Sequence, residues 1–446
     1  MNVELEMKVI WCFLLIGVFV PKSYAQDSTW TLQQCIDYAM EHNLTIQQSE
    51  LDNKLSEINL NGAKMSYYPT LSASSNYGVN LGRSINPTTN QFENTRFSNT
   101  GLSASSNVLL FGWFQKRYAV QKSELQLKQT NENYEQLKDD IALNISTAYL
   151  RALLANEQVS NVLFQIDISK TNKERIEKLL KAGKSNILEV SQSATQLATD
   201  SSIYFQAILN YEQSLIELKT LLHLDYSKAF YIDTQAKELA LFKETPNPET
   251  IYSLASNSFH SIKASEYAEA IAAKDLQITK ASSLPQLNLY YSTGTNYSSS
   301  SFETLPNGET RLRSFGKQAN TNLSQSVGLG LNIPIFNNFS SRNSIKTSKI
   351  SFNRSKIASQ EAQQKLKQAI YTACTDYQLT LQKFQNAQNI LKNAQTAYEA
   401  AHARYEAGLI AYFEFLNEKN NYLKSQNEAS ALKFDLWFKK MLVERF

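Results

Sequence analysis

The chain has 446 residues, of which 42% are hydrophobic and 19% charged, and its formal net charge is +3. This composition excludes a disordered chain, and so small a net charge does not select nucleic acid as a partner. The mean hydropathy is −0.37, and beyond the N-terminus no apolar run approaches the roughly 18 residues of a membrane helix, which excludes a polytopic helical membrane protein.

The first 25 residues have the pattern of a secretory signal peptide. Lys8 precedes an uncharged apolar run over residues 9–20, and a small-residue site ending at Ala25 follows. About 12 apolar residues are too few for a membrane anchor. We therefore expect residues 1–25 to be removed after Ala25.

Glycine and proline are scarce and unevenly placed. Neither occurs from Trp113 to Ala182, nor from Ile335 to Ala407. Runs of this length without a turn residue predict two very long helices, each ending just before a glycine, Gly183 or Gly408. Because a helical pattern resumes at once after each glycine, we expect the tip of a helical hairpin at about residue 183 and at about residue 408.

The chain contains an internal duplication. Phe111 corresponds to Phe336 and Arg117 to Arg342, at the same offset of 225 positions that separates the two tip glycines. Self-similarity at a fixed offset indicates repeated structural units. We place the first repeat at residues 26–245 and the second at 246–446.

The two long helices carry apolar residues at alternating steps of four and three, which is typical of a coiled-coil seam. The seam of the second helix consists of Leu366, Ile370, Ala373, Tyr377, Thr380, Phe384, Ala387, Leu391, Ala394, Tyr398, Ala401 and Tyr405. The seam of the first consists of Ile141, Ile145, Ala148, Ala152, Ala155, Val159, Val162, Ile166, Ser169, Lys173, Ile176 and Leu180. Ser169 and Lys173 interrupt the pattern, and we expect looser or wetter packing there.

Four segments between the helices alternate with a period of two. They are predicted strands at about residues 71–80, 101–111, 287–297 and 323–333, each with one apolar face and one face of Ser, Asn and Gly. Strands of about ten residues with this alternation are typical of a transmembrane β-barrel. A soluble sheet packed on a core is the alternative. Residues 81–99 and 298–321 are expected to be outer loops.

Four strands cannot close a barrel, and open sheet edges are not tolerated in lipid. The chain must therefore oligomerise, and three copies are the smallest assembly that leaves a bore. The predicted fold class is mainly α with a small transmembrane β part, built from a duplicated helix-strand-strand-helix-helix unit.

An enzymatic function has little support in the sequence. The four histidines, His42, His223, His260 and His402, have no ligand spacing, and the two cysteines that remain after cleavage suggest neither a disulfide framework nor a metal cluster. We predict no catalytic, cofactor-binding or metal-binding residues.

The duplicated order, the tip sequence Tyr405-x-x-Gly408 and the acidic residues six positions after each tip glycine, Glu189 and Glu414, resemble the TolC-like outer-membrane efflux protein family. The resemblance covers essentially the whole chain after residue 25. It implies a homotrimer in the outer membrane of a Gram-negative bacterium, with a 12-stranded barrel in the lipid and a helical tunnel extending into the periplasm. It also implies a periplasmic adaptor (membrane fusion) protein and an inner-membrane pump of the RND, ABC or MFS type as partners, in efflux or type I secretion.

The resemblance also implies roles at the hairpin tips. Tyr405 and Glu189 match residues whose polar links close the periplasmic gate, whereas Ile410 stands where well-known members have an arginine. Glu414 matches one acidic ring of the aperture, and Asn417 stands at the position of the other.

Adaptor contact is expected at the tips, at Gly183, Lys184, Arg404, Gly408 and Leu409. A purely structural role is the alternative for the gate residues. Tyr405 also fits the coiled-coil seam, and Glu189 and Glu414 are acids in first helical turns, where the helix dipole favours them. The alternative function is a non-conducting periplasmic coiled-coil scaffold.

Overall fold

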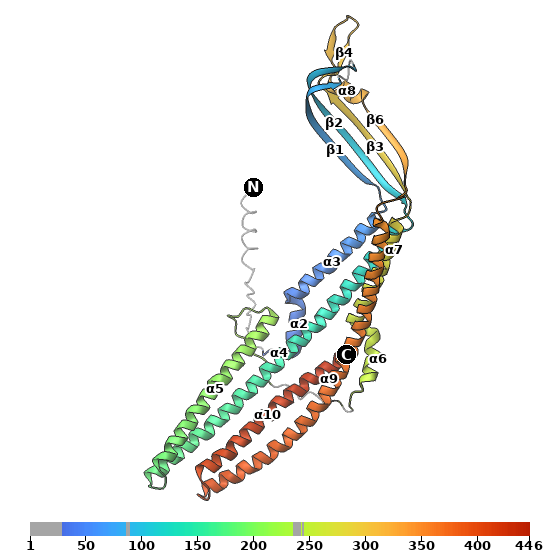
Figure 1. Ribbon diagram of the computed structural model, residues 1–446. Coiled ribbons are helices and arrows are strands. Elements are labelled where there is room, and N and C mark those ends of the chain that lie inside the picture. The colour runs from blue at the N-terminus through green and yellow to red at the C-terminus, as the bar shows by residue number, and fades with distance from the viewer. Residues whose placement is uncertain (1–28, 86–89, 235–241, 243–244) are drawn as a thin grey trace, which may run out of the picture. The chain divides into compact units, whose positions relative to one another are not determined.

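The computed structural model describes residues 29–85, 90–234, 242 and 245–446. The predicted signal peptide lies outside the described residues. The elements in chain order are α2 (Leu32–His42), α3 (Leu44–Met65), β1 (Thr70–Ile85), β2 (Phe92–Phe111), α4 (Gln115–Lys181), α5 (Ile187–Leu222), α6 (Pro248–Ser258), α7 (His260–Ser282), β3 (Gln286–Ser298), β4 (Phe302–Thr304), β5 (Thr310–Leu312), α8 (Phe315–Thr321), β6 (Ser324–Asn332), α9 (Ser340–Glu406) and α10 (Tyr412–Glu444) (Figure 1). None of the helices in these ranges combines the length and apolar character needed to cross a bilayer.

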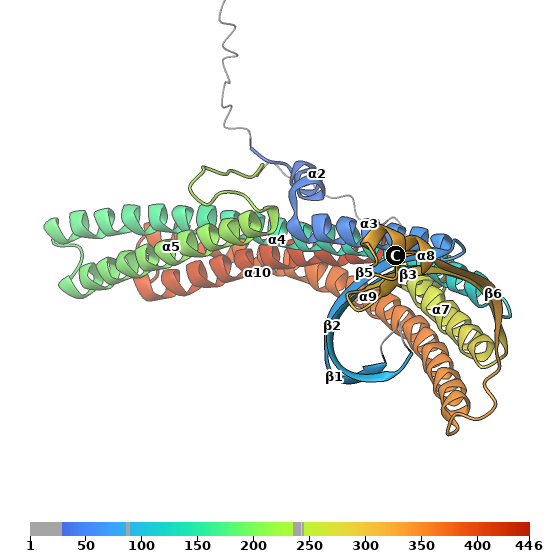
Figure 2. The ribbon, with the colours of Figure 1, turned by 90° about the horizontal axis from the view of Figure 1, so that it is seen from above.

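The chain divides into two compact units. Unit 1 contains the described residues of Met1–Ala39, Asn144–Ala240 and Ala387–Phe434, and unit 2 contains those of Met40–Leu143, Leu241–Asn386 and Asp435–Phe446. Unit 1 therefore holds α5, the C-terminal parts of α4 and α9 and most of α10, which form the two hairpin turns, and both views show these parts of the hairpins side by side (Figure 1, Figure 2). Unit 2 holds both sheets.

The duplication is visible in the helix boundaries. Helices α4 and α9 both have 67 residues, and each bound of α9 lies 225 positions after the corresponding bound of α4. The entrances also correspond, because Trp113 and Phe114 have φ of 53° and 64°, and Asn338 and Phe339 have φ of 53° and 59°. Each long helix thus begins after the same left-handed turn, which non-glycine residues rarely adopt.

The predicted seams lie in the interior of each unit. Every seam residue of both helices is buried or half-buried, and Ile145, Ala152 and Ile370 have no exposed surface at all. The expectation of looser packing at Ser169 is wrong. Ser169 is only 3% exposed and bonds to a buried carboxylate, so its hydroxyl is satisfied within a tight core rather than by water.

The principal sheet is antiparallel, in the order β1-β2-β3-β6. Its register pairs Ala73 with Ala104, Ala104 with Thr293, and Thr293 with Gln325, so the apolar faces predicted for the four strands coincide on one side. The opposite side carries serine pairs joined by hydrogen bonds, for example Ser292 Oγ with Ser326 Oγ at 2.8 Å. The sheet therefore has one apolar and one polar face, as the alternation predicts.

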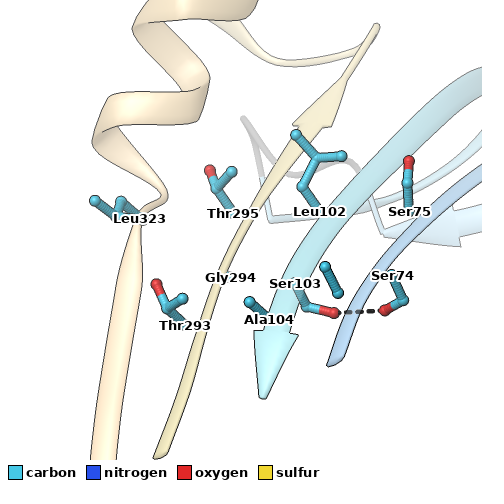
Figure 3. A pocket seen from close by; sticks show the side chains of 10 residues that line it. Ser74, Ser75, Leu102, Ser103, Ala104, Thr293, Gly294, Thr295 and Leu323 are labelled. Carbon is cyan, nitrogen blue, oxygen red and sulfur yellow. Dashed lines mark hydrogen bonds between the residues drawn. The ribbon is translucent and has the colours of Figure 1, made fainter. Parts of the chain in front are cut away.

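A shallow hollow of about 430 Å³ lies on strands β1, β2 and β3, next to Leu323 at the entrance of β6. In Figure 3, Leu102, Thr295 and Leu323 line this hollow, while the hydroxyls of Ser74 and Ser103 are hydrogen-bonded to each other at 2.8 Å. Most of the lining residues are small, and the hollow is open rather than an enclosed ligand pocket.

The two segments expected to be outer loops contain regular structure. Strand β1 continues to Ile85 and β2 begins at Phe92, because Leu81 pairs with Arg96 and Arg83 with Asn94 in unbroken register. Arg83 interrupts the apolar alternation of β1 here, and its guanidinium lies 5.3 Å from the centroid of the Phe92 ring on β2, so backbone pairing and a cross-strand contact extend the strands together. The second segment folds into the β4–β5 hairpin and helix α8.

A buried glutamine makes several of the hydrogen bonds that hold helix α8 on β3. The Gln318 side chain is 1% exposed, accepts a hydrogen bond from Ser298 N at 2.9 Å and donates to the carbonyls of Ser298 and Arg313 at 3.0 and 2.8 Å. Its amide satisfies backbone groups that a short helix and a strand end leave unpaired.

Candidate functional site

The two hairpin turns have the same backbone geometry. Gly183 and Gly408 have φ of 70° and 72°, which favours glycine at both positions. At the first turn Lys184 N donates to Leu179 O at 2.8 Å, and at the second Leu409 N donates to Arg404 O at 2.9 Å. This bond pattern closes the C-terminus of a helix and satisfies carbonyls that have no partner in the helix itself.

The first hairpin turn positions Glu189. Asn186 caps α5 by accepting a hydrogen bond from Glu189 N at 3.0 Å, and Ser185 Oγ donates to Glu189 Oε2 at 2.5 Å. The carboxylate also lies in the first turn of α5, where the helix dipole favours a negative charge. Local chain geometry therefore accounts for the half-buried position of Glu189.

The second turn leaves Glu414 and Asn417 exposed in the first two turns of α10. Lys184 and Arg404 are exposed as well, and Leu409 is 70% exposed. Phe413 and Ile187 add apolar side chains that are 73% and 70% exposed. The hairpin turns thus present charged, amide and apolar groups together on an accessible surface.

Tyr405 is held by its ring. The ring stacks on Phe415 at a centroid distance of 4.9 Å and an interplanar angle of 9°, and the Arg175 guanidinium lies 4.9 Å from the ring centroid. Burial raises the pKa of Tyr405; the charge of Arg175 opposes this shift and that of Glu189 adds to it. The Glu189 charge therefore acts on Tyr405, although no hydrogen bond between the two occurs among the described residues of one chain.

Arg175 is a functional candidate that the sequence reasoning missed. From α4 its Nη2 donates to Glu406 O at 3.0 Å and lies 3.4 Å from Tyr405 O, so a cation neutralises the C-terminus of α9. Ile410, where an arginine was expected from the resemblance, packs instead against the apolar cluster of Ile176, Tyr412 and Phe415. Arg175 thus brings a cation to Tyr405 from the other hairpin. Nothing in its spacing distinguishes it from a solvated helix residue.

Aromatic side chains concentrate on the second hairpin. Tyr398 stacks on Tyr422 at 5.3 Å, and Phe415 contacts Tyr398, His402, Tyr405 and Tyr412. The positions 225 residues earlier that correspond to Tyr398, Tyr405, Tyr412, Phe415 and Tyr422 are Lys173, Leu180, Ile187, Val190 and Leu197. Burial raises the pKa of Tyr412 to about 12, against the opposing hydrogen bond from Asn172. The second hairpin therefore carries a cluster of rings at positions that hold no ring in the first.

Two features of the described residues bear on a chemical role, namely the metal-ligating side chains and the cysteines. No group of three or more His, Cys, Asp or Glu in the described ranges could hold a metal ion. Cys35 and Cys374 are buried free thiols, and burial raises the pKa of both, that of Cys35 to about 12. Buried thiols of this kind are inert.

The sequence matches the family model of the outer membrane efflux proteins over residues 35–222 and 251–436. The chain belongs to this family. It is 22% identical over 358 residues to the outer membrane efflux protein BepC of Brucella suis biovar 1 (strain 1330), an alignment that covers 77% of this chain and 69% of that protein.

Solved channels share the fold. The Campylobacter jejuni CmeC outer membrane channel superposes with a TM-score of 0.79 at 17% identity, covering 92% of this chain and 85% of that one. The Neisseria gonorrhoeae MtrE outer membrane channel gives 0.73 at 17% identity, covering 93% and 88%. These likenesses confirm the mainly helical fold with a small antiparallel sheet in a duplicated unit.

Family membership confirms the predicted role. The protein is an outer membrane efflux channel, without enzymatic activity, of the Gram-negative outer membrane, with a periplasmic extension. Channels of this family are trimeric components of tripartite efflux systems. The family thus favours the conducting channel over the non-conducting scaffold.

Proposed function

We propose that this chain is the passive exit duct of a tripartite pump and that its hairpin turns form the periplasmic gate. Each chain contributes a four-stranded sheet, so three copies would supply twelve strands. The edge strands β1 and β6 would pair with those of the neighbouring copies. The apolar face would meet lipid and the polar face of Ser, Asn and Gly would line the bore. An adaptor protein and an inner-membrane pump of the RND, ABC or MFS type would complete the system and supply the energy.

The exposed tips are the proposed adaptor surface. Lys184, Arg404 and Leu409 project from turns that share one backbone geometry, and the duplication gives two such turns per chain. A homotrimer would therefore present six similar tips. Gly183 and Gly408 allow the tight turns that bring these side chains to the end of each hairpin.

The observation that carries the gate is the environment of Tyr405. Its ring contacts both Phe415 and Arg175, while neither its hydroxyl nor the second carboxylate oxygen of Glu189 bonds to a described residue, and neither atom is fully buried. Both atoms are therefore available to a partner from another chain. A neighbouring copy in the closed trimer would supply it, so that Tyr405 and Glu189 tie adjacent chains together.

The test is the conductance of the purified channel in planar lipid bilayers. The double variant Glu189→Ala with Tyr405→Phe keeps the aromatic stack but removes both polar groups, and we expect a higher conductance at rest. The matched control is Glu249→Ala with Tyr371→Phe, which removes a 2.5 Å tyrosine–glutamate hydrogen bond in unit 2. We expect that control to conduct like the wild type. Unchanged conductance of the first variant would refute the gate at Tyr405.

A further inference from the structure

A buried ion pair links the two hairpins of unit 1. Lys419 of α10 and Asp200 of α5 are 2% and 0% exposed, and Lys419 Nζ lies 3.4 Å from Asp200 Oδ2. Neither residue is at a hairpin turn, and neither belongs to the group around Tyr405. The pair is the product of tertiary packing between residues 219 positions apart.

Three helices contribute to this site. Asp200 Oδ1 accepts hydrogen bonds from Gln165 Nε2 at 2.5 Å and from Gln196 Nε2 at 2.8 Å. Asp200 Oδ2 accepts one from the Ser169 hydroxyl, which in turn accepts one from Lys419 Nζ at 2.5 Å. Both carboxylate oxygens are therefore fully used, by side chains of α4, α5 and α10.

The stability of the helix interface does not by itself explain a buried ion pair at this position. Burial lowers the pKa of Lys419, and the Asp200 charge opposes that shift, so the Lys419 ammonium depends on the carboxylate to remain charged in the interior. A well-packed apolar pair of similar volume would stabilise a helix interface as well or better. What a buried polar group adds is one defined register, because any sliding of the helices leaves a charge unpaired.

Three α4 residues spaced three positions apart make polar contacts with the second hairpin, and the pair contacts the one farthest from the turn. Ser169 bonds to Lys419, Asn172 to Tyr412, and Arg175 lies on Tyr405. Successive steps of three residues place these side chains along one side of α4, facing the second hairpin. Lys419 also lies one helical turn beyond Phe415, the ring on which Tyr405 stacks.

We propose that Lys419 and Asp200 form a buried lock that fixes the position of α10 against α4 and α5, and thereby holds Tyr405 and Glu414 in the closed arrangement. Lys419 is a positioning residue that acts through the second hairpin. The inference rests on the proposed gate, which it deepens by locating a second control point away from the turns. Opening of the hairpins would require this pair to part or to pivot on the flexible lysine side chain.

The test compares stability with conductance in one variant series. Lys419→Met leaves Asp200 buried without its cation, and we expect resting conductance in planar bilayers to rise on the order of tenfold. Lys419→Arg keeps the charge and should conduct close to the wild type. The double variant Lys419→Met with Asp200→Asn removes both charges; it should recover the melting temperature of the wild type yet keep the raised conductance, because register is no longer enforced.

A matched control exists on the same helices. Lys433 of α10 and Glu157 of α4 form a 3.2 Å ion pair that is about one-third exposed, so Lys433→Met removes an α10–α4 link without burying a charge. We expect it to conduct like the wild type. Trimer mass in detergent is measured for every variant, and a variant that does not assemble is replaced by Ser169→Ala, which removes the bridging hydroxyl alone and should raise conductance to a smaller extent.

Two results would overturn the lock: conductance of Lys419→Met equal to that of Lys433→Met, or conductance that follows melting temperature through the whole series, including the double variant. The gate is tested separately by the Glu189→Ala, Tyr405→Phe variant. If that variant opens the channel and Lys419→Met does not, the gate stands and the lock fails. If Lys419→Met opens it and the tip variant does not, the lock stands and the link at Tyr405 fails.

Discussion

Replacing Arg175 with methionine tests how the second hairpin turn is held. Methionine keeps most of the apolar stem and the helix propensity of α4, so the variant removes only the guanidinium. Three favourable contributions are lost: the charged hydrogen bond to Glu406 O at 3.0 Å, the contact with the Tyr405 ring at 4.9 Å, and the cation at the C-terminus of α9.

The magnitude follows from these contacts. For a half-exposed side chain, the charged hydrogen bond contributes about 1 kcal/mol, the ring contact about 0.5 kcal/mol and the helix terminus about 0.5 kcal/mol. The last turn of α9 should therefore lose about 2 kcal/mol of local stability, which corresponds to about a 30-fold increase in its opening equilibrium.

Hydrogen exchange measures this opening directly. The amides of Gly408 and Leu409 donate to Tyr405 O and Arg404 O, and their exchange should accelerate by about this factor in Arg175→Met. The equivalent amides of the first turn, Gly183 and Lys184, have the same geometry and should exchange at the wild-type rate.

The variant Arg404→Met is the control, because it removes an exposed positive charge from the same turn. The reasoning is refuted if Gly408 and Leu409 accelerate by less than about threefold, or if both turns accelerate equally, since the latter would indicate global rather than local opening.

Three further outcomes are expected. Burial raises the pKa of Cys35 from 9.0 to about 12, so at pH 9 only about one-thousandth of this thiol should be thiolate in the folded protein. A maleimide should therefore leave Cys35 unmodified until denaturant is added. Rapid labelling of the native channel would contradict its burial. Glu414→Gln should reduce the cation preference of the channel, measured as a smaller reversal potential in a salt gradient, and an identical potential would remove Glu414 from the aperture. Ile370→Ala, at a position with no exposed surface, should lower the unfolding free energy by about 3 kcal/mol in denaturant titration, whereas Gln368→Ala on the exposed side of the same helix should have little effect.

The sequence by itself determines the repeating elements. The absence of Gly and Pro over α4 and α9, the four-three spacing of their apolar residues and the glycines at 183 and 408 are local properties, and each acts within a few residues of the position it fixes. The faces of the strands are predictable for the same reason, since alternation assigns every side chain to one side once a strand forms.

Tertiary structure alone decides which distant side chains meet. Arg175 and Tyr405 are 230 positions apart and Lys419 and Asp200 are 219 apart, and no spacing along the chain relates them. Ser169 illustrates the difference: its place in the seam was predictable, but the sequence suggested a weak point. The packed helices instead supply a buried partner, which makes the same hydroxyl part of a fixed link. Local patterns encode secondary structure and burial, whereas polar pairing depends on how helices are brought into register across the whole fold.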